Sequence, residues 1–118
     1  MLNIFPSIDT PVCAKSVKTF THDAAHATNT VVLNIAADLP FALKRFCAAE
    51  GIENATTLST FRSTFANDYG VKILDSGFAG LCARAVVVLN EKNQILYTEL
   101  VPEIAQEPNY AKALAALR

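Results

Sequence analysis

The sequence predicts a single α/β domain in which helices pack on a mixed β-sheet. Short apolar segments of strand length alternate with segments of helical periodicity along the chain, which is typical of layered α/β folds. With 118 residues the chain can bury one hydrophobic core but not two. Hydrophobic residues make up 52% of it, charged residues only 18%, and the mean hydropathy is +0.27, which excludes a disordered chain. We therefore expect one domain over residues 1–118.

The first unit is a short strand followed by a helix. Residues 1–5 are apolar and stop at Pro6, which favours a buried strand and then a loop. Pro11 suits the first turn of a helix, and Thr10 suits its N-cap. Apolar residues at steps of four, three and four then define one helical face, namely Cys13, Val17, Phe20 and Ala24. Cys13 is therefore expected in the first turn, on the inward side.

The second unit repeats the order of strand and helix. Residues 30–37 are apolar and rich in β-branched side chains, as expected of a strand. Asp38 stands two residues before a proline and is expected to cap a helix over residues 41–50, which a glycine ends. Cys47 falls in the last turns of this helix.

The second half of the chain predicts shorter elements. In order, these are a strand at residues 56–59, a helix at 61–69 that ends at Gly70, two strands at 85–89 and 94–101, and a helix that opens at Glu107 and Pro108. The link between the two long strands is short and polar, which suits a hairpin, so these strands should be antiparallel.

The order of these elements predicts how the sheet is built. Right-handed crossovers make the first two strands parallel neighbours. The first strand is expected near the centre, because its residues are apolar without alternation, as in strands covered on both faces. The result is a thioredoxin-like plan with three layers, α/β/α, around a central mixed sheet.

Charge and cysteine content exclude several classes of protein. The net charge is −1, and lysines and arginines are scattered singly, so no nucleic-acid or membrane partner is expected. The apolar runs are too short to span a bilayer and no secretory signal opens the chain, so the expected location is the cytoplasm. The three cysteines form no CxxC pair, and their odd number argues against a secreted disulfide framework.

Cys13 is the candidate for chemistry. A cysteine in a first helical turn faces free backbone N–H groups and the positive end of the helix dipole, which favour the thiolate. The dipole alone contributes ~0.3–1 kcal/mol, so a second cation is needed, and Arg84, just before a valine-rich strand, is the candidate. Pro6, Thr10 and Cys13 are spaced by four and three residues, which places a hydroxyl and a thiol around one pocket. From the residues alone, a cysteine at a helix start is more often a small buried hydrophobic residue than a reactive thiol, so Cys13 by itself does not decide between the two.

The segment from Pro6 through Thr10 to Cys13 closely resembles the active-site segment of peroxiredoxins, with their Pro-x-x-x-Thr-x-x-Cys pattern. Further segments along essentially the whole chain resemble the bacterial thiol peroxidases, which are atypical two-cysteine peroxiredoxins. These segments are Ala37-Asp-Leu-Pro-Phe-Ala42, Arg45-Phe-Cys47, Leu58-Ser-Thr-Phe-Arg62, Ala83-Arg-Ala-Val-Val-Val88, Leu100-Val101 and Glu107-Pro-Asn-Tyr110.

The resemblance implies an activity and a role for each site residue. Cys13 would be the peroxidatic cysteine, which attacks the peroxide bond of hydrogen peroxide or an alkyl hydroperoxide and becomes a sulfenic acid. Thr10 and Arg84 would bind and orient the peroxide, and Pro6 would shield the thiolate from water. Cys47 would be the resolving cysteine, which forms an intramolecular disulfide with Cys13 that thioredoxin reduces.

The resemblance also implies a homodimer and no metal or organic cofactor. Phe61, Phe65 and Phe78 could contribute to a dimer surface, but a core role is equally open for each. His22 and His26 mimic part of a zinc-protease helix, yet no third ligand is evident, so solvated histidines are expected. Cys82 has no role in the family pattern and is expected in the core, although it could form a stray disulfide with Cys13.

One departure from the family affects the expected activity. Thiol peroxidases normally carry N-terminal strands ahead of the segment that opens this chain. Without them, we expect an unpaired sheet edge and uncovered apolar surface. The alternative function is therefore a weakly active redox-sensing or interaction module on the same core.

Overall fold

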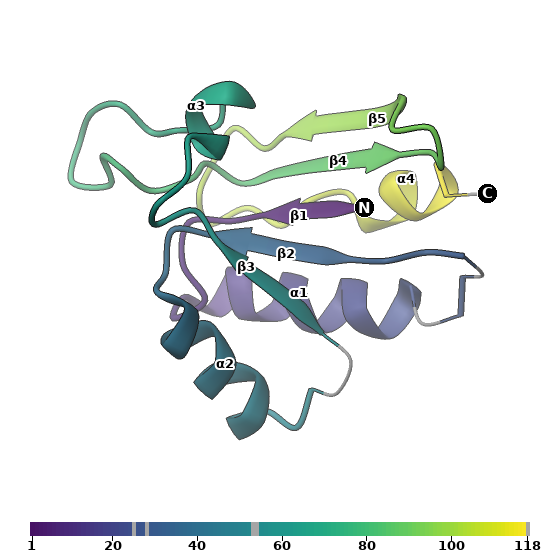
Figure 1. Ribbon diagram of the computed structural model, residues 1–118, viewed down its shortest axis with the longest axis horizontal. Helices are drawn as coiled ribbons and strands as arrows, with labels where there is room; N and C mark the ends of the chain where they lie inside the picture. The colour runs from purple at the N-terminus through teal and green to yellow at the C-terminus, as the bar shows by residue number, and fades with distance from the viewer. Residues whose placement is uncertain (25, 28, 53–54, 118) are drawn as a thin grey trace.

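The computed structural model describes residues 1–24, 26–27, 29–52 and 55–117. These residues form a five-stranded mixed sheet with the strand order β3-β2-β1-β4-β5 (Figure 1). The strands are β1 (Leu2–Ile4), β2 (Leu33–Ala36), β3 (Thr56–Ser59), β4 (Ala85–Leu89) and β5 (Ile95–Leu100). The first three are parallel, whereas β4 is antiparallel to both β1 and β5. The central place of β1 and the antiparallel hairpin are both as predicted.

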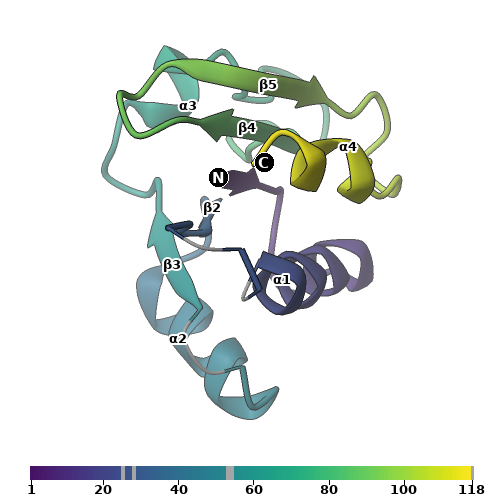
Figure 2. The same ribbon diagram turned by 90° about the vertical axis from the view of Figure 1, so that its right-hand side faces the viewer.

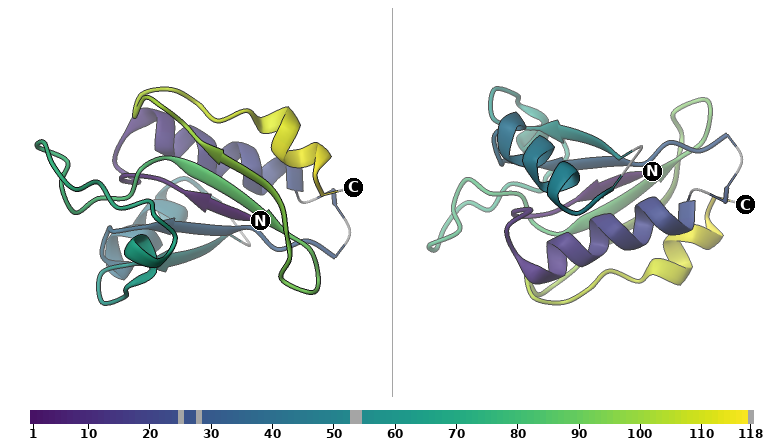
Figure 3. Two further views of the ribbon diagram at one scale, coloured as in Figure 1. Left: turned by 90° about the horizontal axis from the view of Figure 1, so that it is seen from above. Right: turned by 90° about the horizontal axis from the view of Figure 1, so that it is seen from below.

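Helices cover both faces of the sheet. In the described residues they are α1 (Pro11–Ala24), α2 (Pro40–Ala49), α3 (Phe65–Asp68) and α4 (Tyr110–Ala115). Helices α1 and α4 lie on one side of the sheet and the short α3 lies on the other (Figures 2 and 3). Successive right-handed crossovers from β1 to β2 to β3 put α2 on the same face as α1, and a shared apolar cluster joins the two helices. The three-layer α/β fold with a central mixed sheet is confirmed.

The alternation of β1 divides the core into two sides. Leu2 and Ile4 pack toward α3, in a cluster that also holds Cys82. Met1 and Phe5 point the other way and pack with residues of α1. Side chains of consecutive strand residues leave opposite faces of the sheet, so this short strand contributes to the core on both sides.

Several elements are shorter than predicted, and local hydrogen bonds explain the three largest differences. Strand β2 begins at Leu33 rather than at residue 30, because its ladder partner β1 has only three residues. Helix α3 begins at Phe65 rather than at residue 61, since a turn closed by the Ser63 N–H and the Thr60 carbonyl precedes it. Helix α4 begins at Tyr110, where the Asn109 side chain accepts a hydrogen bond from the Lys112 N–H. In the described part of the chain, none of the helices has the length and apolarity to cross a membrane.

Candidate active site

Cys13 lies in the first turn of α1, close to the carboxyl end of the central strand. The helix opens with the Ala14 N–H, which donates to the Thr10 carbonyl at 2.9 Å. The Cys13 side chain is 0% exposed. Its apolar neighbours come from the end of β1, from β2 and from both helices of this face, and they are Phe5, Ile8, Val17, Ala36 and Leu43. The predicted inward orientation of Cys13 is confirmed.

Arg84 reaches the sulfur of Cys13 from the strand side of the pocket. Its Nη2 donates to Cys13 Sγ at 3.0 Å, and the arginine itself is only 1% exposed. The Ile104 carbonyl accepts two further hydrogen bonds, from Arg84 Nε at 3.2 Å and from Nη2 at 2.8 Å. Arg84 Nη1 is buried and has no acceptor in the described residues. The predicted proximity of the arginine and the cysteine is confirmed.

The surroundings of Arg84 define its effect on the sulfur. A guanidinium stays charged at every relevant pH, and a buried cation is costly unless an anion or polar groups compensate it. Among the described residues, its hydrogen-bond acceptors are the Ile104 carbonyl and the Cys13 sulfur, and neither is a carboxylate. A thiolate at Cys13 would supply the missing negative charge, so this pairing favours the reactive form of the cysteine.

A short ion-pair network ties the loop that carries Ile104 to α1. Lys15 Nζ lies 3.1 Å from Glu107 Oε1, and the Tyr110 hydroxyl donates to the same carboxylate oxygen at 3.1 Å. The hydrogen bond from Lys15 lowers the pKa of Glu107. Burial, followed by the bond to Glu107, raises the pKa of Tyr110 to about 12. Both groups therefore keep their charge states around neutral pH.

The loop between β1 and α1 supplies Pro6 and Thr10. Pro6 is fully buried, which is compatible with a shielding role. The Thr10 hydroxyl donates to the Ser7 carbonyl at 2.9 Å, and the Thr10 N–H points to the same carbonyl at 3.3 Å. The hydroxyl hydrogen is thus engaged, and the lone pairs of Thr10 Oγ1 remain available as acceptors.

Asp38 does not cap α2 with its side chain, and this prediction was wrong. The N-cap of α2 is Leu39, without a side-chain hydrogen bond. The Asp38 carboxylate instead crosses to the loop after β1, where Oδ1 accepts from the Ser7 hydroxyl and Oδ2 from the Ile8 N–H, both at 2.8 Å. Since these donors are remote in the sequence, the prediction followed the more frequent local role of an aspartate before a helix.

A buried polar network below Cys13 has no counterpart in the sequence analysis. Asn3 on β1 donates to Asn34 Oδ1 on β2 at 3.0 Å and lies 3.4 Å from Ser16 Oγ on α1. Ser16 in turn donates to the Cys13 carbonyl at 2.9 Å. All three polar side chains are 0% exposed. The signal was two asparagines inside apolar strands, where a buried amide needs a partner.

Cys47 lies on α2 and makes no disulfide with Cys13 in this reduced structure. Its side chain is half-buried, one helical turn beyond Leu43, which packs in the same cluster as Cys13. Cys13 begins one helix while Cys47 stands near the end of another. Burial raises the pKa of the Cys47 thiol, so this cysteine stays protonated at neutral pH in the folded state.

Cys82 is buried on the opposite face of the sheet. It is 0% exposed in the cluster below α3, with the Thr60 hydroxyl 3.9 Å from its sulfur. Burial is the largest influence and raises the pKa of its thiol, whereas the hydrogen bond with Thr60 lowers this pKa and the charge of Asp38 raises it. The predicted core role of Cys82 is confirmed, and the sheet separates it from the cluster that holds Cys13.

The two histidines give no metal site in the described residues. Their rings are 5.8 Å apart, and His22 Nδ1 lies 3.0 Å from the Asp23 carboxylate at the exposed end of α1. No group of three or more potential metal ligands occurs in the part of the chain that the structure describes.

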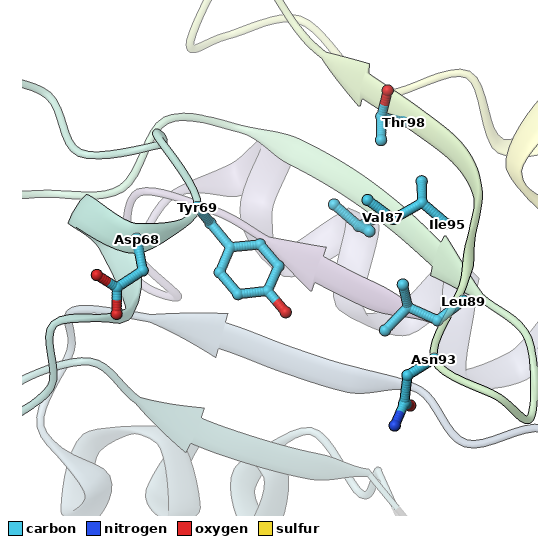
Figure 4. Close-up of a pocket in the computed structure, with 7 residues that line it drawn as sticks. All are labelled: Asp68, Tyr69, Val87, Leu89, Asn93, Ile95 and Thr98. Carbon is cyan, nitrogen blue, oxygen red and sulfur yellow. The ribbon is translucent and has the colours of Figure 1, made fainter.

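A concavity opens on the side of the sheet opposite to Cys13, between α3 and the β4–β5 hairpin (Figure 4). It is a shallow groove of about 700 Å³ lined by Asp68, Tyr69, Val87, Leu89, Asn93, Ile95 and Thr98. Apolar side chains on the adjoining strand β5 are exposed, with Leu96 at 52% and Leu100 at 63%. None of the predicted site residues lines this groove, so it is distinct from the Cys13 pocket.

Comparison with known proteins identifies the family. The profile of the Redoxin family matches residues 1–114. The chain belongs to the Redoxin family. Within it, the chain is 62% identical over 117 residues to a thiol peroxidase of Mycobacterium tuberculosis, a match that covers 99% of this chain and 70% of the relative. It is also 57% identical to a thiol peroxidase of Corynebacterium glutamicum, over 99% of this chain and 71% of that relative.

Solved structures with the same fold agree with this assignment. A peroxiredoxin-like protein from Aquifex aeolicus superposes with a TM-score of 0.93 at 39% identity, over 98% of this chain and 68% of that one. A thiol peroxidase from Chromobacterium violaceum has the same fold, with a TM-score of 0.84 at 21% identity over 98% of this chain. The resemblance to thiol peroxidases seen in the sequence is therefore confirmed.

Proposed function

We propose that this Redoxin protein is a thiol-dependent peroxidase in which Cys13 is the peroxidatic cysteine. The observation that carries the proposal is the 3.0 Å contact between Arg84 Nη2 and Cys13 Sγ in a pocket that buries both side chains. A cation held at this distance from a sulfur favours the thiolate, which is the nucleophile in peroxide reduction. The thiol peroxidase relatives support the same activity.

Peroxide reduction would use the groups that surround the sulfur. The Cys13 thiolate attacks one peroxide oxygen, the O–O bond breaks, and the cysteine becomes a sulfenic acid while the other oxygen leaves and takes up a proton as water or an alcohol. Arg84 Nη1, buried and without an acceptor in the described residues, would donate to the oxygen on which negative charge develops. Thr10 Oγ1, with its hydrogen committed to Ser7, would accept the hydrogen of the peroxide.

Resolution would involve Cys47. Its thiol attacks the sulfenic sulfur of Cys13, a disulfide forms, and water leaves. A disulfide needs Cα atoms within ~7 Å, and Cys13 begins one helix while Cys47 stands near the end of another, so we expect the first turn of α1 and the last turns of α2 to unwind. Unwinding also exposes Cys47 to water, which removes the burial that raises its pKa and makes it a better nucleophile.

A dithiol reductant of the thioredoxin type would complete the cycle. Thiol–disulfide exchange transfers its two electrons to the Cys13–Cys47 bridge and restores both thiols. Hydrogen peroxide and alkyl hydroperoxides are the proposed substrates, and the cytoplasm is the proposed location. A homodimer is also proposed, with Phe61 at 65% and Phe78 at 50% exposure as contact candidates, whereas Phe65 is half-buried and stacks on Tyr69 at 4.2 Å.

Peroxide consumption with a thioredoxin system tests this proposal. We expect Cys13→Ser to abolish turnover, because it removes the attacking thiolate. Cys47→Ser should still form the sulfenic acid but fail to recycle efficiently, whereas the matched control Cys82→Ala should retain turnover. Full activity of Cys13→Ser would refute the assignment of Cys13.

The same assay separates the peroxidase from the redox-sensing alternative. A sensing module would become oxidised by excess peroxide without sustained turnover. Repeated turnovers at low peroxide concentration are the expected result, because the Cys13 and Arg84 pair is complete in this chain.

A further inference from the structure

We infer that Asp38 is a positioning residue for peroxide reduction, which acts by holding the loop that presents Thr10. This inference rests on the proposed peroxidase function of Cys13. Asp38 lies at the carboxyl end of β2, outside the loop that it binds. Its carboxylate is separated from its two donors by 31 and 30 residues of sequence.

Both oxygens of the Asp38 carboxylate bind the same short segment. The Ser7 hydroxyl donates to Oδ1 and the Ile8 N–H donates to Oδ2, each at 2.8 Å. Hydrogen bonds to an ionised carboxylate are about twice as strong as neutral ones. Because the two bonds converge on adjacent residues, they fix the position and the orientation of the loop between Pro6 and Thr10.

Ser7 passes this constraint on to Thr10. While its hydroxyl donates to Asp38, the Ser7 carbonyl accepts the Thr10 hydroxyl at 2.9 Å and faces the Thr10 N–H at 3.3 Å. The rotamer of Thr10 therefore depends on where Asp38 holds Ser7. Thr10 is also the residue whose carbonyl accepts the Ala14 N–H at the start of α1, so the same path leads to the turn that carries Cys13.

Asp38 itself is held from the opposite side. Its backbone carbonyl accepts a hydrogen bond from the Ser59 hydroxyl, and Ser59 Oγ also accepts from the Phe61 N–H at 3.1 Å. Thr60 donates its N–H to the Ala36 carbonyl at 2.9 Å. Hydrogen bonds from Ser59, the last residue of β3, and from Thr60 thus hold the short link after β2 that carries the Asp38 carboxylate.

The test compares two reactions of the reduced protein, one that uses Thr10 and one that does not. Reaction with hydrogen peroxide requires the in-line arrangement of Cys13, Thr10 and the peroxide oxygens. Alkylation of Cys13 by iodoacetamide needs only an accessible thiolate. A positioning role should therefore slow the first reaction selectively, whereas a loss of folding would expose Cys13 and change both.

We expect Asp38→Ala to lower the second-order rate constant with hydrogen peroxide about 100-fold, the usual cost of misplacing a reacting group by an ångström. The alkylation rate should stay unchanged. Asp38→Asn retains one acceptor oxygen but presents an NH₂ group to the other donor, so a loss of about tenfold is expected from one charge-assisted hydrogen bond. Asp9→Ala removes a carboxylate from an exposed position in the same loop and is the matched control, with no change expected.

A double-mutant cycle identifies the residue through which Asp38 acts. If Asp38 acts through Thr10, the peroxide rate of Thr10→Val will already be low, because this variant removes the group that Asp38 positions. Adding Asp38→Asn to Thr10→Val will then lower the peroxide rate little further. Additive losses would overturn the assignment, because Asp38 would then act elsewhere. Ser7→Ala provides a second route if Asp38→Ala does not fold, and it should also lower the peroxide rate selectively.

The outcomes also distinguish this inference from the proposed function. Turnover in Cys13→Ser would overturn the proposed function. A peroxide rate equal to that of the parent in Asp38→Ala or Asp38→Asn, with Cys13 still essential, would overturn only the role of Asp38. Equal changes in peroxide reaction and alkylation would also overturn it, since they indicate a purely structural aspartate.

Discussion

Cys13 and Cys82 are equally buried but chemically opposite. Each is 0% exposed, one below α1 and the other below α3. Cys13 Sγ accepts a hydrogen bond from a buried guanidinium, whereas Cys82 lies among apolar residues that raise the pKa of its thiol. A cysteine that is buried without a neighbouring cation is a core residue, whereas a cysteine that is buried beside a fixed cation is a candidate nucleophile.

The chain produces this difference within a few residues. Arg84 follows Cys82 by two positions and immediately precedes β4. Along β4, Val86 and Val88 pack on the side of α1 and α4, while Ala85 and Val87 pack on the side of α3. Because side chains alternate along a strand, Arg84 lies on the same side as Val86 and Val88, and there it reaches Cys13. Cys82 lies ahead of the strand, paired with Lys72 in an isolated bridge, and falls on the other side.

Removal of the cation from Cys13 should have the largest effect. Arg84→Leu is expected to lower the rate constant with hydrogen peroxide about 100- to 1,000-fold, as loss of a transition-state donor does. Arg84→Lys keeps the charge but loses the planar fork, so its rate should be intermediate. Stopped-flow oxidation of the reduced protein gives these rates.

The matched control for this prediction is Arg62→Leu. Arg62 is exposed and belongs to neither cysteine cluster, so its removal should leave the peroxide rate unchanged. An Arg84→Leu variant as fast as the parent would contradict the distinction between the two cysteines.

A polar substitution at Cys82 should affect stability and not activity. Cys82→Ser places a hydroxyl in a mainly apolar cluster, with the Thr60 hydroxyl as its polar neighbour, and is expected to cost about 1–3 kcal/mol of unfolding free energy. Cys82→Ala avoids the buried hydroxyl and should cost about 1 kcal/mol. Urea denaturation measures both, and the peroxide rate of each variant should equal that of the parent. A slower peroxide reaction in Cys82→Ala would show that the two clusters are coupled.

Alkaline pH should reveal the smallest effect. Because burial raises the pKa of Cys82 above the ordinary value of 9.0, the unfolded chain releases this proton first as the pH rises. The contribution of the protonated Cys82 thiol to the unfolding free energy is complete below pH 9.0 and is lost as the pH rises through the pKa of the folded state. The unfolding free energy of the parent should therefore fall more steeply above that pH than that of Cys82→Ala. Identical slopes in urea titrations would show that the Cys82 thiol is not desolvated.

The sequence was sufficient for the parts of the fold and site that depend on local pattern. Apolar periodicity placed Cys13 inward in the first turn of α1, and the uninterrupted apolar character of β1 placed it at the centre of the sheet. The contact with Arg84 could also be anticipated, because a thiolate in a helix needs a cation beyond the dipole.

Contacts between distant polar residues could not be predicted in this way. Asp38 was interpreted as a helix cap because that is the nearest use for its carboxylate, whereas the folded chain brings Ser7 and Ile8 to it. The hydrogen bonds from Asn3 to Asn34 and Ser16 depend both on the register of the strands and on the placement of α1. Such partners are determined by the assembled sheet and not by spacing along the chain.

The amide pair of Asn3 and Asn34 has a consequence for how the sheet assembles. The two residues are direct neighbours in the parallel ladder of β1 and β2. A slip of one residue would turn one amide to the opposite face, among hydrocarbon side chains, and break the hydrogen bond between the two asparagines. In strands as short as these, apolar side chains alone specify the register weakly. The asparagines therefore favour one alignment of β1 with β2, and the contact from Asn3 to Ser16 links that alignment to α1.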